Sequence, residues 1–405
     1  MRSLLIGKTW PEPASTAAGR RTQDIVQVLA MLGGDVHVAS PAQRTAFSLA
    51  GASAGFTEHD IAVNDDAFDA WLADLAPDIV VFDRYVMEEQ FGWRVSTVCP
   101  GAVRVLDTSD LHCLREARAE QIKHGGALSL FNDTALREIA AIARCDLTLL
   151  ISPVELELLV ERFQVPEFLL HHTPFMLTPL PDENTLVPYQ KRQHVMMIGN
   201  FLHAPNWDAT QWLRAQWPHW RHKFPTGTEV HVYGSYATEK VQQLHNPAQG
   251  FHIKGRAEDA IATLAQYRVN LAYLRYGAGI KGKVADAWLA GTPTVASPIA
   301  AEGMHGDLPW GSPVTDDAEA FFQAAAELYR QPDVWQQAVM QGRNVAAQCH
   351  DTLMESVALS GRLMEVQQDL AAHRQHNLWG RILQQQQYRA TEYMSRWITE
   401  KNRLR

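Results

Sequence analysis

The sequence has few cysteines and no long apolar run. Only 4 of its 405 residues are cysteines, and none of them forms a C-x-x-C pair: Cys99, Cys113, Cys145 and Cys349. This pattern excludes a disulfide-rich scaffold and a cysteine zinc site. No stretch approaches the roughly 18 to 20 continuous apolar residues of a membrane helix, and Leu4-Leu5-Ile6 is too short for a signal-peptide core. We therefore expect a soluble, cytoplasmic protein without a transmembrane segment.

The chain also lacks an excess of positive charge. It has 36 Lys and Arg against 45 Asp and Glu, a formal net charge of -9. Residues 1–175 hold 14 basic and 24 acidic side chains, which argues against a general nucleic-acid binder. The end of the chain differs, since residues 360–405 hold 8 basic and 4 acidic side chains. A basic C-terminal helix is predicted there, open to contact with an anionic surface.

The last helix also has apolar residues three to five positions apart, which places much of this set on one face. We expect that face to dock onto another part of the molecule. Its members are Tyr388, Tyr393, Met394, Trp397 and Ile398.

Common metal and nucleophile motifs are missing as well. The sequence contains no H-E-x-x-H, no D-x-D at a predicted strand end, no G-x-S-x-G and no Walker loop. His171 and His172 are adjacent on a predicted strand and so point to opposite faces. We predict no metal site.

What the sequence does contain is an alternation of short apolar runs and helical patterns, typical of β-α-β units on parallel sheets. The predicted strands fall into two similar α/β halves, and from about Asp316 the pattern is only helical. The strands are 3–7, 35–39, 78–82, 103–106, 147–151 and 168–171, then 194–198, 229–233, 251–254, 269–274 and 294–296. The predicted domains are residues 1–175, a Pro-containing linker at 176–193, residues 194–355, and C-terminal helices at 356–405 that cross back to the first domain.

One loop has the composition of an anion site. After the strand that ends at Leu274, three glycines fall within six residues and a helix starts near Gly282. Glycines let backbone amides approach a phosphate, and a helix N-terminus adds partial positive charge. The cations and glycines concerned are Arg275, Gly277, Gly279, Lys281 and Lys283. Asp286, one turn into the helix, is placed to accept from ribose hydroxyls. The same residues also fit an ordinary glycine turn with solvated lysines and a surface acid.

This loop belongs to a longer pattern that resembles a known family. The run G-x-G-I-K-x-K-x-x-[DE]-A, followed by G-T-P-x-V and E-G, resembles the donor-binding half of GT-B glycosyltransferases, in particular family 4. Residues 198–209, in the form G-N-x-x-x-x-P-N-x-D-A, resemble the opening of the same domain. The resemblance covers about residues 194 to 310. It implies the GT-B fold, two Rossmann-like α/β domains facing a cleft, with a helical C-terminal extension.

The resemblance further implies a retaining transfer from a nucleotide-sugar donor, with no metal and no cofactor. In such chemistry cations, amides and positioning stabilise the leaving diphosphate. The implied donor-binding residues, beside those of the glycine loop, are Gly199, Asn200, His203, Asn206 and the amide of Ile280. In the first half, the loop of Ala18, Gly19 and Arg20 is placed to meet the acceptor or the distal phosphate, and His112 to contact the transferring sugar. Arg275, Lys283 and His112 are the predicted catalytic residues.

One position departs from the family pattern. Many members carry two glutamates eight positions apart, but Ala278 stands where the first, sugar-contacting one is expected. Either Glu302 takes that role, or backbone amides of Gly279 and Ile280 hold the sugar, or activity is lost. A non-catalytic nucleotide-sugar-binding or scaffold protein therefore stays open as an alternative. A nucleotide-sugar epimerase also stays open, because such enzymes share the implied architecture. The sequence does not identify the acceptor, and glycans, lipid-linked molecules and macromolecules all stay open.

Overall fold

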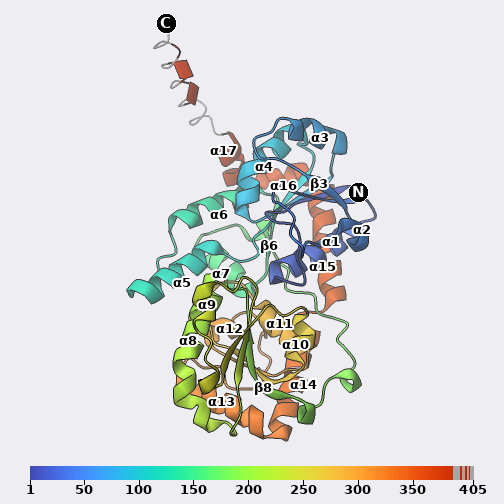
Figure 1. Cartoon of the computed structure of the whole chain (residues 1–405). Helices are drawn as coiled ribbons and strands as arrows, with labels where there is room; N and C mark the ends of the chain where they lie inside the picture. The colour runs from blue at the N-terminus through green and yellow to red at the C-terminus, as the bar shows by residue number, and fades with distance from the viewer. Residues whose placement is uncertain (386–392, 395–396, 399–400, 402–405) are drawn as a thin grey trace.

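The computed structural model describes residues 1–385, 393–394, 397–398 and 401. Two α/β domains are stacked in the view of Figure 1, each built on its own parallel sheet. The first part of the chain forms the upper domain, the next part forms the lower one, and the C-terminal helices return to the upper domain. This architecture confirms the expected class of two Rossmann-like domains with a helical C-terminal region.

Within the described residues, the first sheet has seven parallel strands in the order β3-β2-β1-β4-β5-β6-β7. Their bounds are β1 (Ser3–Ile6), β2 (Val36–Ser40), β3 (Thr57–Asp60), β4 (Ile79–Asp83), β5 (Val103–Asp107), β6 (Leu147–Leu150) and β7 (Leu170–His172). Strands covered on both faces read as continuous apolar runs, which is why most of them could be predicted. The sequence Thr57-Glu58-His59-Asp60 of edge strand β3 has no apolar residue, so this strand was missed.

Helices cover both faces of the first sheet. Leu4 and Ile6 of β1 pack into one core with α3, α4 and α6, while Leu5 faces the opposite core with α1. The helix bounds are α1 (Ala17–Met31), α2 (Gly51–Ala54), α3 (Ala67–Leu75), α4 (Tyr85–Val98), α5 (His112–His124), α6 (Asp133–Arg144) and α7 (Pro153–Glu161).

The second sheet has the order β10-β9-β8-β11-β12, and its paired strands are also parallel. Their bounds are β8 (Gln193–Ile198), β9 (Val230–Tyr233), β10 (Phe251–Gly255), β11 (Tyr267–Ala272) and β12 (Thr294–Ala296). The helices of this domain are α8 (Ala204–Trp220), α9 (Glu239–Gln242), α10 (Ala260–Leu264), α11 (Gly282–Leu289), α12 (Pro298–Ala301), α13 (Ala318–Arg330) and α14 (Pro332–Cys349).

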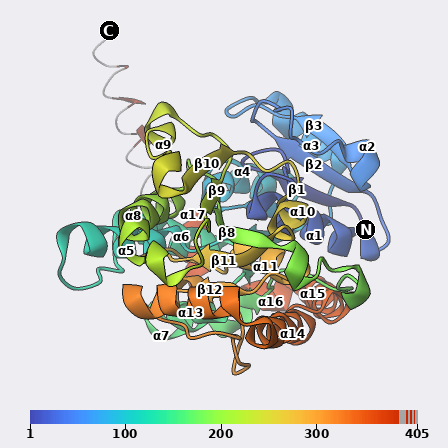
Figure 2. The same cartoon turned by 60° about the horizontal axis from the view of Figure 1, so that its bottom comes forward.

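Alternation along β8 directs side chains to the two faces of this sheet. Val195 and Met197 join the large core that includes residues of α8 and α13, whereas Met196 packs with Ala287 of α11 and Leu264 of α10. Figure 2 shows α8 on one side of the strands and α10 and α11 on the other.

The C-terminal helices α15 (Thr352–Gln368), α16 (Leu370–His376) and α17 (Leu378–Gln385) pack on the first domain. Leu359, Leu363 and Val366 of α15 enter the same core as α1. In α16, Arg374 pairs with the buried Asp146 at 2.8 Å. Among the described residues, no helix is both long and apolar enough to cross a membrane.

The predicted docking of the last apolar face is not seen. Tyr393, Met394, Trp397 and Ile398 are exposed. Tyr388 lies outside the described residues, as does much of the basic segment. From α13 onward, every regular element of the described chain is a helix, as the sequence indicated. The three boundaries between the predicted segments stay predictions.

Candidate functional site

The glycine loop lies at the C-terminal end of β11, between Leu274 and the start of α11. Gly279 has φ 62°, in the left-handed region that favours glycine. A Cβ atom there would lie 2.9 Å from Cβ of Asp110 and 3.1 Å from Cγ2 of Ile151, both in the first domain. Glycine is therefore required for backbone shape and for close approach of the two domains. Ile280 is buried in the core of the second domain.

Two helix N-termini meet at this loop. A Cβ atom on Gly282, the first residue of α11, would lie 2.5 Å from Cβ of Ala17, the first residue of α1. In Figure 1 α11 lies at the end of the lower domain that faces the upper one. Each N-terminus carries partial positive charge and backbone N–H groups that lack partners in their own helix. The converging ends form an environment that favours an anion.

Two lysines beside these helix ends are shielded from solvent, Lys281 fully and Lys283 in part. Lys281 donates to the carbonyl oxygens of Ala278 and Gly279, and Lys283 donates from Nζ to Oδ1 of Asn206 at 2.5 Å. Burial lowers the pKa of Lys281 to about 8, against the raising effect of Glu302 and Glu155. Burial and the charge of Lys281 lower the pKa of Lys283 to about 7. Neither lysine forms an ion pair within the part of the chain that the structure describes.

Asn206, on the first turn of α8, connects Lys283 to the end of β8. Its Nδ2 donates to the carbonyl of Asn200 at 3.0 Å, so that Oδ1 is turned to Lys283. A Cβ atom on Gly199 would collide with the Asn206 side chain, at 2.6 Å from Cγ. His203 precedes α8, and burial together with the nearby cation Arg115 lowers its pKa to about 4. The structure thus brings these predicted donor residues together with Lys283.

Glu155 of α7 reaches the glycine loop from the first domain. Its side chain is buried, and Oε1 accepts the N–H groups of Leu111 at 2.9 Å and Gly279 at 2.8 Å. Burial raises its pKa to about 8, and the charge of Asp110 adds to this effect. Oε2 is buried without a hydrogen-bond partner among the described residues. A carboxyl group therefore stands next to Ala278, although it comes from another element.

His112 begins α5 at the same domain boundary. Its backbone N–H donates to Glu138 at 2.9 Å, its Nε2 lies 3.5 Å from Oδ1 of Asp110, and its ring packs edge-on against Tyr85. Burial lowers the pKa of His112 to about 4, although the Asp110 carboxylate opposes this shift. The imidazole is accordingly neutral at neutral pH.

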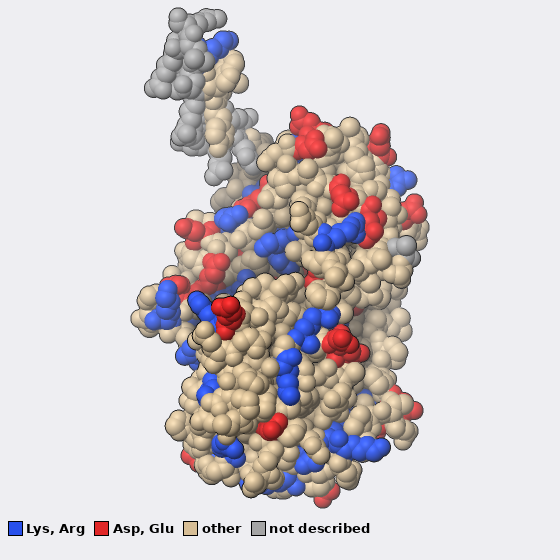
Figure 3. Space-filling model, viewed as in Figure 1, with Lys and Arg blue, Asp and Glu red and all other residues tan. Residues whose placement is uncertain are grey.

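Charged pairs cross the boundary between the domains on both sides of the loop. Arg118 of α5 binds Glu302 through two hydrogen bonds, at 2.8 and 2.7 Å, and also donates to the carbonyl of Gly277 at 2.8 Å. Arg20 of α1 forms an ion pair with Asp286 of α11. Glu302 and Asp286, predicted to face the donor, thus have cationic partners from the first domain. Basic and acidic atoms are visible along this boundary in Figure 3.

Two of the predicted residues, Gly19 and Arg275, make local contacts that the sequence pattern did not indicate. The amide of Gly19 donates to Oγ1 of Thr16 at 3.0 Å, which caps α1. Ala18 lies beside it in the first turn. Arg275 is 42 % exposed and pairs with Asp208 of α8, with Nε 2.9 Å from Oδ2. Its guanidinium therefore pairs with α8, the helix whose first turn also contacts Lys283 through Asn206.

Glu155, Arg118 and Asp110 also belong to this site and were not predicted from the sequence. Glu155 and Asp110 have a weak signal, since each lies just beyond a predicted strand, at the sheet edge where α/β domains bind ligands. Arg118 is inside a helix of ordinary composition, and only the packing of the two domains shows its role.

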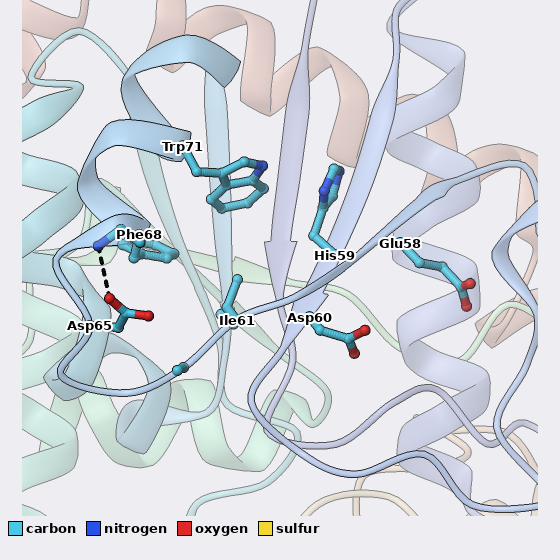
Figure 4. Close-up of a pocket in the computed structure, with 9 residues that line it drawn as sticks. Glu58, His59, Asp60, Ile61, Asp65, Phe68 and Trp71 are labelled. Carbon is cyan, nitrogen blue, oxygen red and sulfur yellow. Dashed lines mark hydrogen bonds between the residues drawn. The ribbon is translucent and has the colours of Figure 1, made fainter.

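A separate hollow lies at the far edge of the first sheet, between β3 and α3 (Figure 4). Trp71 and His59 line it, with ring centroids 4.9 Å apart, together with Asp60 and Phe68. Neither β3 nor α3 contributes to the glycine loop, so we treat this hollow as distinct from the candidate site.

Comparison with known proteins agrees with the geometry of the second domain. Residues 192–331 match the family model described as Glycosyl transferases group 1. The match includes the glycine loop and the start of α8, and it confirms the resemblance to glycosyltransferases for this part of the chain, whereas family 4 stays a prediction. No curated protein sequence matches.

Solved structures resemble nearly the whole chain. HepE of Anabaena in complex with UDP-glucose has a TM-score of 0.68 at 12% identity, covering 90% of this chain and 99% of that one. Sucrose-phosphate synthase of Thermosynechococcus elongatus has a TM-score of 0.65 at 14% identity, and the match covers 92% of this chain and 100% of that one. A glycosyltransferase of Rickettsia africae ESF-5 has a TM-score of 0.65 at 11% identity, and the match covers 91% of this chain and 99% of that one. At these identities the likeness concerns the fold, and the fold of this chain is GT-B.

Proposed function

We propose that this GT-B protein is a glycosyltransferase that moves a sugar from a nucleotide-sugar donor to an acceptor. The family match over residues 192–331 and the fold shared with a UDP-glucose complex support this function. The observation that carries it is the pair of shielded lysines, Lys281 and Lys283, at the meeting point of two helix N-termini.

An ammonium group taken out of water without a carboxylate partner is costly, by several kcal/mol in real proteins. The lowered pKa values of Lys281 and Lys283 reflect this cost directly, because the neutral amine is favoured by burial. A bound diphosphate removes the penalty by pairing with both cations. The site is therefore arranged for a ligand with two or more negative charges, which a nucleotide sugar provides.

In the proposed reaction, the bond between the anomeric carbon and the phosphate oxygen breaks while the acceptor oxygen bonds to that carbon. The acceptor hydroxyl approaches the face from which the phosphate leaves and gives its proton to the departing phosphate oxygen. Because attack and departure are on the same face, the anomeric configuration is retained. Negative charge grows on the diphosphate, where Lys281, Lys283 and the N-termini of α1 and α11 stabilise it. These groups are fixed in place before the reaction, since backbone and Asn206 contacts hold both lysines.

We assign the sugar side of the site to His112 and to the amides of the glycine loop. The neutral imidazole of His112 can exchange hydrogen bonds with a sugar hydroxyl without adding charge. Ala278 removes the usual acid, but Glu155 holds the Gly279 amide and stands beside it. Asp286 retains the ribose role, with Arg20 as its partner from the first domain.

We extend the proposal to family 4, to a reaction without a metal or other cofactor, and to a cytoplasmic location. Four free cysteines support a reducing compartment. The acceptor is proposed to bind on the first domain, near the C-terminal ends of β4 and β5. Asp83 and Asp107 end those strands, and Lys8 and Arg84 lie beside Asp83.

The test is a donor panel. The purified chain is incubated with UDP-, GDP- and ADP-sugars, with and without a cell extract as acceptor source, and release of nucleoside diphosphate is measured. We expect release from one donor, accelerated by the extract, and an α-linked product from an α-linked donor in the NMR spectrum. Tight binding of a donor without release under any condition would support the non-catalytic alternative, and an isomerised free donor sugar would support the epimerase.

A further inference from the structure

A second group of polar side chains lies at the opposite end of the second sheet from the glycine loop. His194, His231 and His252 are the second residues of β8, β9 and β10, and Glu229 directly precedes β9. His252 is paired with His231 in the register of neighbouring strands, and Val195 is paired with Val230. Because the strands are parallel, all four side chains lie at the N-terminal end of the strands. With about 3.3 Å of rise per residue, this end lies roughly 16 Å from Gly199 at the other end of β8.

The two ring nitrogens of His231 lie within hydrogen-bond distance of Glu229 and Tyr267. Nε2 of His231 lies 2.7 Å from Oε2 of Glu229, and Nδ1 lies 2.7 Å from Oη of Tyr267. Oη of Tyr267 in turn lies 2.8 Å from Oη of Tyr233. Metal-bound histidines characteristically donate their second ring N–H to a fixed acceptor, and Tyr267 supplies one here.

His252 provides a ring nitrogen with no hydrogen-bond partner. Its Nε2 is buried, lies 3.4 Å from Oε1 of Glu229, and has no hydrogen bond among the described residues. The Glu229 carboxylate thus stands between two imidazoles, and its side chain is 35% exposed, which leaves a path from solvent.

His194 contributes in another way. Ligand atoms of His194, Glu229 and His231 lie within 4.8 Å of one another. Nδ1 of His194, however, accepts the backbone N–H of Glu229 at 3.2 Å, so its Nε2 carries the proton. His194 has φ 56°, a costly conformation for a residue with a side chain. Its ring therefore holds Glu229 in place and is not counted as a ligand.

We propose that Glu229, His231 and His252 bind a divalent transition metal of the zinc type, as a structural tie between β9 and β10. Two imidazoles and one carboxylate form a ligand set that Zn²⁺ takes in proteins, with water in the fourth position. The ligands come from neighbouring strands at nearly the same level. His252 is outside the group of residues whose ligand atoms lie within 4.8 Å of one another, so its ring has to turn toward His231 to complete the ligand set. The spacing of the three residues in the sequence follows no metal motif. The expectation of no metal site rested on the absence of such motifs, and this inference replaces it for this end of the sheet.

The test uses the full chain with any affinity tag removed and Zn²⁺ alone as the probe. Calorimetric titration of the wild type is expected to show saturable binding of about one ion per chain. Glu229→Gln and His252→Ala should each weaken binding at least about tenfold, because each removes a ligand. His222→Ala is the matched control, because His222 is exposed in the same domain, and its affinity should equal that of the wild type. Absence of saturable binding to the wild type, or wild-type affinity in the two ligand variants, would overturn the proposal.

A second measurement needs no variant and so does not depend on folding of the mutants. Histidines of the wild type are modified with diethylpyrocarbonate with and without Zn²⁺ and are mapped by mass spectrometry. Zinc should protect His252 and leave His222 unprotected. Equal modification of His252 under both conditions contradicts the site.

Discussion

The carboxyl group of Glu155 accepts a hydrogen bond from the amide of Gly279, at 2.8 Å and across the boundary of the two domains. The same oxygen accepts the amide of Leu111 at 2.9 Å. One buried side chain therefore fixes the glycine loop of the second domain relative to the first. Because Gly279 adjoins both Ala278 and Ile280, this contact sets the position of the loop that is proposed to hold the donor.

Glu155→Ala is expected to weaken donor turnover, whereas Glu155→Gln should not. Alanine leaves two buried amides without an acceptor, at a cost of about 1 to 3 kcal/mol each. Glutamine keeps the accepting oxygen, and the raised pKa of Glu155 means that the native group is largely neutral at pH 7. We predict a loss of at least roughly tenfold in nucleoside diphosphate release for the first variant. The second should stay within about threefold of the wild type. Equal losses in both variants would contradict a positioning role.

Donor affinity should fall as the pH rises above neutrality. The pKa of Lys283 is about 7 in the free protein, and a bound diphosphate favours its protonated form. The apparent dissociation constant should therefore rise by up to about tenfold per pH unit above pH 7, because the cation must be regained on binding. A nucleotide sugar is the suitable probe, since its diphosphate diester does not titrate in this range. An affinity that stays constant from pH 6 to 9 would contradict the involvement of this lysine.

Stability of the free protein should follow the opposite trend. Lys283 stays protonated in the unfolded chain up to the ordinary lysine pKa of 10.5, but when folded it loses its proton near pH 7. The unfolded state thus binds more protons between these values, and the free energy of unfolding rises with pH there. Denaturant unfolding at several pH values measures this, with Lys283→Met as the comparison. An identical pH slope in that variant would exclude Lys283 as the cause.

A double-mutant cycle separates two roles of Asp286. If this carboxylate binds ribose, Asp286→Asn weakens nucleotide binding by about 1.5 to 3 kcal/mol, as for a hydrogen bond to a charged group. The loss should then persist in an Arg20→Ala background. If Asp286 only holds Arg20, then Asp286→Asn should have no further effect on nucleotide binding in the Arg20→Ala background. Calorimetric titration of the four proteins with the preferred nucleoside diphosphate decides between these outcomes.

His112→Ala tests the sugar side of the site. We expect turnover to fall at least roughly tenfold, with nucleoside diphosphate affinity changed by less than about threefold. The wild type should show no loss of turnover near pH 6.5, the ordinary pKa of histidine, because burial lowers the pKa of His112 to about 4. A parallel loss of turnover and nucleotide affinity in the variant would instead indicate a role in folding or in phosphate binding.

Much of the fold was predictable because the strands are covered on both faces. Continuous apolar runs such as residues 79–82 of β4 leave little choice of structure. Edge strand Thr57–Asp60 has no such run, since half of its surroundings are solvent, and it was missed. The helical C-terminal region was also expected, but the last apolar residues, including Trp397, are exposed.

The donor loop could be predicted because its chemistry is local. Glycines, lysines and a helix start lie within one short segment of the sequence, from Gly277 to Lys283. The contacts across the domain boundary could not, because they join residues more than 100 positions apart, as in Glu155 with Gly279 and Arg118 with Glu302. The pairing of Arg275 with Asp208 likewise depends on where α8 lies in space.

The proposed diphosphate site is tested most directly by the affinity of nucleoside diphosphates for the wild type and for Lys283→Ala. Calorimetric titration with UDP, GDP and ADP should identify one tight ligand, and the variant should bind it at least about tenfold more weakly, a loss of about 1.4 kcal/mol. Lys191→Ala is the control, since this exposed lysine lies outside the site, and it should match the wild type. Equal affinity of the Lys283→Ala variant and the wild type would contradict a diphosphate site at Lys281 and Lys283.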